Sequence, residues 1–175
     1  MELNKIKYFS IFMIFIFCFI THFLYDIFPS FLTSLFFPVN ESIWEHMKML
    51  VSSILIWEFI LYFIFKINNY YFENFFLNVL CTCLCSVFIF LIFYFPLYFI
   101  FGHSFFINVI LLFVSIFFSV NFGFCILNKY NYNLELFSFI LIVVLYILFG
   151  IFTYYPPQNT IFLDPVSGSY GISSD

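Results

Sequence analysis

The chain has 175 residues, of which 65% are hydrophobic and only 8% are charged. A soluble domain of this size needs a larger share of polar residues to cover its surface, so the composition excludes an ordinary soluble protein. The formal net charge is −4 and no arginine occurs, which leaves no basic patch for nucleic acid. We therefore expect most of the surface to contact a lipid bilayer.

Five long apolar stretches follow one another along the chain. A helix needs about 20 mostly apolar residues to cross the hydrocarbon core. The stretches are continuous rather than alternating, which favours helices over the strands of a barrel. We predict an all-α bundle in one membrane domain, with spans at about 8–25, 47–65, 75–98, 105–127 and 134–155.

The first span follows Lys5 and Lys7 and could be mistaken for a signal peptide. Its apolar part is long and no small-x-small cleavage site follows it, so we expect an uncleaved anchor. His22 and Asp26 lie one helical turn apart at its end. Such a pair suits a ligand site, or a carboxylate that orients an imidazole, although a polar span end that reaches the headgroups would look the same.

The most polar stretch is "NESIWEH", residues 40–46, at the end of the loop 26–46 that leads into the second span. On a continuous helix Glu41 and Glu45 would share one face, with His46 about 100° further round. Carboxylates and an imidazole can act as general base and acid, so these three residues are the candidate catalytic set. They can also hold a divalent cation, which makes a metal ion of unknown identity a candidate cofactor.

Helix capping offers a structural explanation for part of the same stretch. Ser42 and Glu45 match a capping box, Asn40 is an alternative N-cap, and acidic residues favour the positive end of a helix dipole. Capping explains Glu41 and His46 least well.

Glu58 lies well inside the second span, where an ionisable group is costly and therefore a functional candidate. It lies about 20 Å from Glu45 along a helix and cannot share its site. A protonated acid and a proton or ion pathway both remain open. In "CTCLC" of the third span only Cys81 and Cys85 share a helical face, and thiols in a bilayer usually behave as small apolar groups.

The polar residues after the third and fifth spans complete the candidate set. His103 in "FGHS" is a loop residue that matters only if the fold brings it to the cluster. The tail 156–175 starts with two prolines, which end a helix. Its apolar residues lie among turn signals, which suits a segment folded back so that Asp164 approaches Glu41 and His46.

Lysine placement predicts the orientation, because cytoplasmic loops near spans collect positive charge. With the amino terminus in the cytoplasm, Lys5, Lys7, Lys66 and Lys129 fall inside and only Lys48 falls outside. The carboxyl terminus, the segment 26–46 and all three histidines are then extracytoplasmic.

Two stretches, "HFLYD…PVNESIWEHMKML" and "YYPPQNTIFLDPVSGSYGI", carry a resemblance that covers nearly the whole chain. The chain resembles a family of small integral membrane proteins of unknown function from low-GC Gram-positive bacteria. The resemblance implies a multi-span helical fold in the bacterial cytoplasmic membrane, but no reaction. Its motif positions are Asn40, Glu41, Trp44, Glu45, His46, Pro156, Pro157, Asp164, Pro165, Tyr170 and Gly171.

Three classes of function fit these observations. The first is a membrane-embedded hydrolase or transferase that acts on a lipid or lipid-linked substrate, with Glu41 or Glu45 as base or metal ligand and His22, His46 and Asp164 as partners. The second is an accessory protein that binds another membrane component, and the third is a small transporter that uses Glu58. No phosphate loop, nucleophile elbow or HExxH motif selects among them.

Overall fold

The computed structural model describes residues 3–172 and is built from helices. Five of them are long and apolar enough to cross a membrane, which confirms the predicted all-α bundle. In the described residues the only β-pairing is a single bridge between Leu163 and Tyr170. The helices are α1 (Leu3–Ile27), α2 (Phe31–Phe36), α3 (Ile43–Ile67), α4 (Phe75–Phe101), α5 (Phe105–Leu127) and α6 (Glu135–Tyr154).

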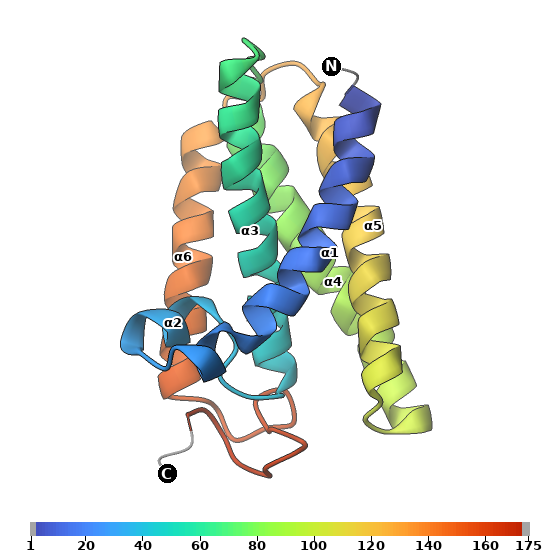
Figure 1. Ribbon diagram of the computed structural model, residues 1–175, viewed down its shortest axis with the longest axis vertical. Coiled ribbons are helices and arrows are strands. Elements are labelled where there is room, and N and C mark those ends of the chain that lie inside the picture. The colour runs from blue at the N-terminus through green and yellow to red at the C-terminus, as the bar shows by residue number, and fades with distance from the viewer. Residues whose placement is uncertain (1–2, 173–175) are drawn as a thin grey trace.

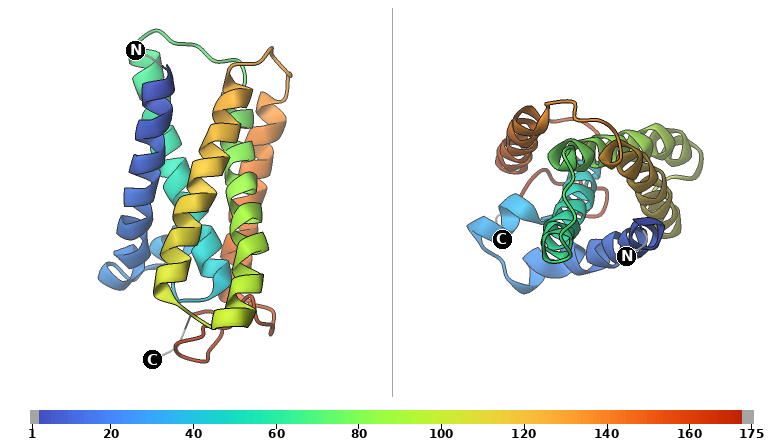
Figure 2. Two further views of the ribbon diagram at one scale, coloured as in Figure 1. Left: turned by 90° about the vertical axis from the view of Figure 1, so that its right-hand side faces the viewer. Right: turned by 90° about the horizontal axis from the view of Figure 1, so that it is seen from above.

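The five long helices run roughly along one axis (Figures 1 and 2). The most extensive packing is between α4 and α5, while α1 packs against α3 and α5, and α6 against α4 and α2. Contact between α6 and α3 is slight, which leaves a groove between them that α2 covers at one end.

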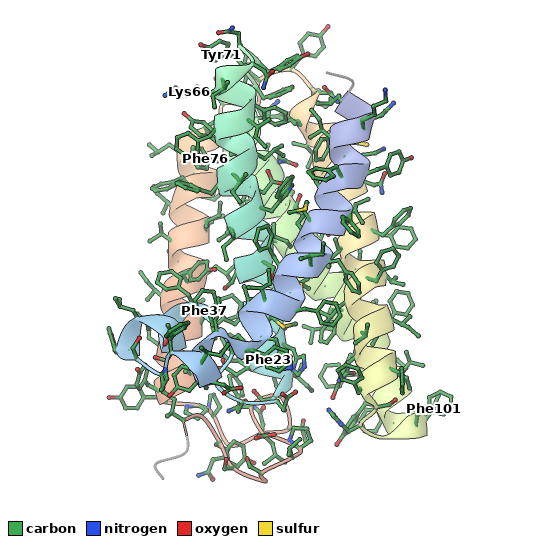
Figure 3. All side chains as sticks on the ribbon, viewed as in Figure 1. Phe23, Phe37, Lys66, Tyr71, Phe76 and Phe101 are labelled. Carbon is green, nitrogen blue, oxygen red and sulfur yellow. The ribbon has the colours of Figure 1, made fainter. Side chains whose placement is uncertain are left out.

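The two ends of the bundle are formed by different segments of the chain. Lys66 and Tyr71 lie at the end where α1 begins (Figure 3). The opposite end carries α2, the start of α3 and the tail that follows α6 (Figure 1). We call this second end, formed by residues 28–46 and 155–172, the α2 end.

Helix α2 lies inside the segment that the sequence analysis treats as a loop. Its start has a capping box, in which the Ser30 side chain accepts from Thr33 N and the Thr33 side chain accepts from Ser30 N. Phe31 and Leu32 of this helix are largely exposed.

The tail folds back over the start of α3. Trp44 N donates to the Ile161 carbonyl at 3.0 Å, and Asn40 Nδ2 donates to the Gly171 carbonyl at 2.8 Å. The Trp44 ring also packs against Phe149 of α6 and Phe162 of the tail. These contacts place the segment before α3 and the tail at the same end of the bundle.

A glycine sets the spacing of α4 and α5. A Cβ on Gly123 would lie 2.1 Å from Thr82 Oγ1 and 2.4 Å from Asn78 Oδ1, and both of those side chains are fully buried. Small residues allow helix backbones to approach closely inside a membrane.

We therefore expect Gly123→Ala to destabilise the bundle by about 1–3 kcal/mol, the usual cost of overpacking. Thermal unfolding of the purified protein in detergent measures the effect as a lower Tm. Gly150→Ala is the matched control, because its Cβ would meet only the tip of the flexible Leu35 side chain. Equal Tm values for the two variants would contradict the proposed spacing role.

Candidate functional site

The start of α3 divides the "NESIWEH" stretch into two parts. Ser42 is the N-cap and its side chain accepts from Glu45 N at 3.3 Å, while Ser42 N donates to Asn40 Oδ1 at 2.9 Å. Helical geometry therefore begins only at Ile43, after Glu41. The expectation that Glu41 and Glu45 share one helical face is wrong for this reason, and the two carboxylates join different clusters.

Glu45 lies in a buried ion pair. Its Oε2 is 2.5 Å from Lys48 Nζ, and the side chains of Glu45 and Lys48 are 2% and 0% exposed. Thr153 Oγ1 of α6 donates to Glu45 Oε1 at 2.7 Å, and Val39 N donates to Glu45 Oε2 at 3.2 Å. Lys48 Nζ also donates to the Ser34 carbonyl at 2.8 Å and to Thr153 Oγ1 at 2.9 Å.

This network, which we call the Lys48 cluster, joins α2, α3 and α6. Two charges removed from water are tolerated only when each is paired and its remaining hydrogen-bonding positions are satisfied. Here all three Lys48 donors can be used, by Glu45, Ser34 and Thr153. The geometry assigns Glu45 to holding the α2 end together, since its carboxylate is closed off from any substrate.

Glu41 lies between two histidines that come from different helices. Its Oε1 is 3.4 Å from His22 Nε2 of α1, and its Oε2 is 3.6 Å from His46 Nε2 of α3. The side chains of Glu41, His22 and His46 are 36%, 22% and 10% exposed. The fold thus joins three of the predicted residues in one site, which we call the Glu41 cluster, and Glu41 is its most open member.

The protonation of His46 is constrained by its second ring nitrogen. His46 Nδ1 lies 2.9 Å from the Ser42 carbonyl oxygen. A carbonyl oxygen only accepts hydrogen bonds, so Nδ1 must carry the proton. In a neutral ring Nε2 then has a lone pair, and this lone pair faces the Glu41 carboxylate, which also only accepts.

A small cavity lies beside the Glu41 cluster. Its volume is about 40 Å³, enough for a water molecule or a similarly small species. His103 and Asn108 also line it, so the fold does bring His103 to the cluster. The other lining residues are mainly apolar: Cys18, Phe19, Met49, Phe105, Val109 and Leu112.

Within residues 3–172, no three His, Cys, Asp or Glu side chains are arranged as ligands of one metal ion. The Glu41 cluster has the donor types that a divalent cation accepts, two imidazole nitrogens and a carboxylate. In the geometry described here the carboxylate oxygens face the two imidazole nitrogens directly, at 3.4 Å for His22 and 3.6 Å for His46.

Three predicted partner residues have other positions. Asp164 organises a turn of the tail, where it accepts from Val166 N at 2.8 Å and from Ser167 Oγ at 2.6 Å. Asn40 ties the tail to the start of α3 through the Gly171 carbonyl. In the described part of the chain no hydrogen bond or ion pair joins Asp26 to His22, although both belong to α1.

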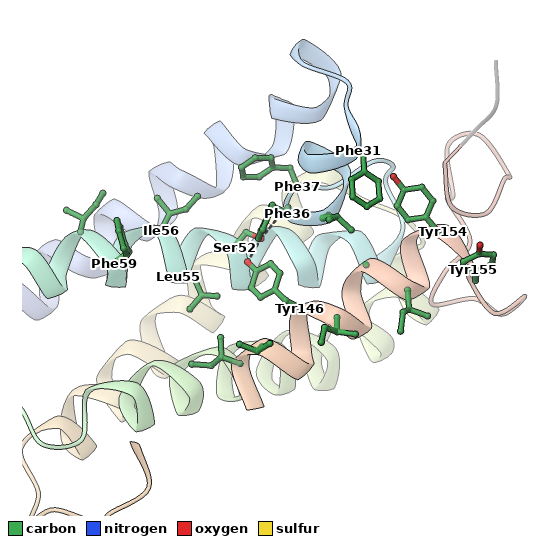
Figure 4. Close-up of a pocket in the computed structure, with 17 residues that line it drawn as sticks. Phe31, Phe36, Phe37, Ser52, Leu55, Ile56, Phe59, Tyr146, Tyr154 and Tyr155 are labelled. Carbon is green, nitrogen blue, oxygen red and sulfur yellow. Dashed lines mark hydrogen bonds between the residues drawn. The ribbon is translucent and has the colours of Figure 1, made fainter. Parts of the chain in front are cut away.

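An apolar groove runs along α3 and α6 from the α2 end (Figure 4). Its volume is about 1100 Å³, and among its few polar groups are Ser52 Oγ and Tyr146 OH, which lie 2.8 Å apart. Ser52 also hydrogen-bonds to the Phe36 carbonyl. The groove and the cavity of the Glu41 cluster share no lining residue, so they are separate sites.

Sequence reasoning missed Thr153 and Asn108, and it interpreted Lys48 only as a topology signal. The spacing of Glu45 and Lys48, three residues apart in an apolar context, is the signal that could have revealed their ion pair. No sequence signal identifies Thr153 or Asn108, because both contacts depend on how helices pack.

The sequence matches a model of a protein family. This family model, described as "Family of unknown function (DUF6512)", covers residues 1–172. The chain belongs to this family. No curated protein and no solved structure matches it. Family membership therefore brings no reaction with it, and function has to be argued from the site.

The Lys48 cluster generates a stability prediction. Lys48→Met leaves the buried Glu45 carboxylate without its cation, so we expect a loss of about 3–5 kcal/mol in the free energy of unfolding. Unfolding of the purified protein in detergent measures the loss. Lys66→Met, at the exposed end of the same helix, is the matched control and should change the free energy of unfolding by less than about 0.5 kcal/mol.

The double variant Glu45→Gln with Lys48→Met separates pairing from simple loss of packing. It removes both charges together, so we expect it to be more stable than Lys48→Met alone. A double variant as unstable as the sum of the two single variants would contradict the ion-pair assignment.

Proposed function

We propose that this protein is a multi-pass membrane protein with an acid–base site, the Glu41 cluster, that binds and releases a proton from the extracytoplasmic side. The main support for this proposal is that His46 Nε2 faces the Glu41 carboxylate while His46 Nδ1 is hydrogen-bonded to the Ser42 carbonyl. Two acceptors face each other there. A proton between them converts the contact into a charge-assisted hydrogen bond.

The exposure of the cluster supports exchange with water. Glu41 is the most exposed of the three side chains and His46 the least, so a proton can enter through Glu41 and pass to a ring beside it. His22 Nε2 lies on the other carboxylate oxygen and offers a second position for the same proton. Both contacts exceed the roughly 2.6–3.2 Å of direct proton transfer, so the proton would pass through one water or after a closer approach of the side chains.

The positions of the lysines support an orientation for the site. Lys66 lies at the end opposite the α2 end, and Lys129 lies beside the start of α4, where its carbonyl accepts from Asn74 Nδ2. Lys48 is buried in its ion pair and adds no free charge to the α2 end. We propose that the α2 end faces outward from a bacterial cytoplasmic membrane, as the positive-inside tendency favours.

A hydrolase or transferase acting on lipids is a less favoured reading of the same site. The cavity of about 40 Å³ admits a water molecule but not a lipid headgroup. The large apolar groove, which suits acyl chains, opens elsewhere. The accessory-protein reading has no specific observation in its favour.

Titration of the three histidine rings by nuclear magnetic resonance tests the proposal. We expect the signals of His22 and His46 to change together with pH in the wild type. Glu41→Gln should alter both titration curves, because the shared carboxylate is gone. Asp26→Asn is the matched control, since it removes a carboxylate at the end of α1 for which no ion pair or hydrogen bond to either ring is found in the described residues.

Two outcomes would overturn the assignment. Curves that are identical in the wild type and Glu41→Gln would mean that the carboxylate does not share a proton with the rings. Ring signals that respond to added Zn²⁺ at constant pH, and return with a chelator, would assign the cluster to a metal ion instead.

A further inference from the structure

A second polar group lies deep in the bundle, away from the Glu41 cluster. Glu58 of α3 is 2% exposed, and Asn78 and Thr82 of α4 are 0% and 1% exposed. Glu58 is twelve residues beyond His46, which is about 18 Å along the helix. The Glu58 group and the Glu41 cluster are therefore separate sites.

The hydrogen bonding of this group is incomplete. Asn78 Nδ2 donates to Glu58 Oε2 at 3.5 Å, which is long for an N–H···O hydrogen bond. Asn78 Oδ1 and Thr82 Oγ1 have no partner in the described residues. Both oxygens lie within 2.4 Å of the point where Gly123 would carry a Cβ, so they converge on one small space against α5.

The charge of Glu58 has no counter-ion nearby. On its own helix, Lys48 is ten residues away and paired with Glu45, and Lys66 is eight residues away at the helix end. Helices α4 and α5 carry no charged residue, and α6 carries only Glu135, bound to the first turn of α4 through Phe76 N and Leu77 N. The charged and histidine residues of α1 lie near its ends: Lys5, Lys7, His22 and Asp26.

The other titratable groups around Glu58 are neutral thiols and phenols. Cys83 of α4 interacts electrostatically with Glu58, and Tyr146 of α6 interacts with Cys83. Cys18 of α1 is buried beside Ser53, and Cys125 of α5 is exposed. None of these groups supplies a positive charge, and an unpaired carboxylate inside a bilayer is costly.

We propose that Glu58, Asn78 and Thr82 form a proton-binding site inside the membrane-spanning bundle, in which the Asn78 amide reverses when the proton binds. The oxygen and the nitrogen of an amide have nearly the same size, but one accepts and the other donates, so reversing the group exchanges an acceptor for a donor in the same place. With Glu58 ionised, Asn78 Nδ2 faces the carboxylate, while the acceptor Asn78 Oδ1 and the Thr82 hydroxyl, which can donate or accept, have no partner in the described residues.

A proton on Glu58 removes this defect. The carboxylic acid then donates its O–H to Asn78 Oδ1 of the reversed amide. Asn78 Nδ2 turns towards Thr82 Oγ1, which accepts from it. One proton thus neutralises the charge and gives both unpaired oxygens a partner, and its release returns the amide to the first arrangement.

Infrared spectroscopy of the purified protein in lipid nanodiscs at neutral pH tests this site. A protonated carboxylic acid has a carbonyl band that is distinct from carboxylate bands and moves in D₂O. We expect Glu58→Gln to lose one such band. Asn78→Leu keeps Glu58 but removes the amide, so the band should remain and shift.

Glu41→Gln is the control and should retain the Glu58 band, which separates this site from the Glu41 cluster. The D₂O shift in the wild type provides the measurement if a variant fails to fold. A wild type without a protonated acid band, or a band equally present in Glu58→Gln, would overturn the inference. A band unmoved by Asn78→Leu would also overturn it, because the amide would then have no part in binding the proton.

Discussion

The ion pair of Glu45 and Lys48 is the contact on which the α2 end depends. Burying two charges in an apolar bundle costs free energy that only close pairing and full hydrogen bonding offset. Thr153, Ser34 and Val39 supply the remaining bonds from α6, α2 and the segment before α3. Three segments that are far apart in the sequence are therefore fixed relative to one another.

That arrangement determines where the side chains of the Glu41 cluster lie. The ion pair holds the first turn of α3, and Ser42 at the start of that turn holds His46 through its carbonyl. Glu41, just outside the helix, is left to face His22 and His46. The two carboxylates thus have different surroundings. Glu45 is enclosed by its partners, whereas Glu41 remains open to water.

The sequence predicts the parts of this structure that follow from local pattern. Long apolar runs identify five helices, and Ser42 is recognisable as a helix cap. The contacts of Glu45 were not predictable in the same way, because Thr153 and Ser34 reach it only through the packing of α6 and α2. The prediction that Glu41 shares a helical face with Glu45 was wrong for a local reason. The helix begins at Ile43, two residues after Glu41.

The tautomer of His46 is the measurement that tests this account most directly. Nitrogen-15 chemical shifts of the labelled ring at high pH distinguish a proton on Nδ1 from one on Nε2. The account predicts the Nδ1–H form, because the Ser42 carbonyl can only accept. A neutral ring protonated on Nε2 would contradict it, since Nε2 would then donate to Glu41 and leave no place for an exchanged proton.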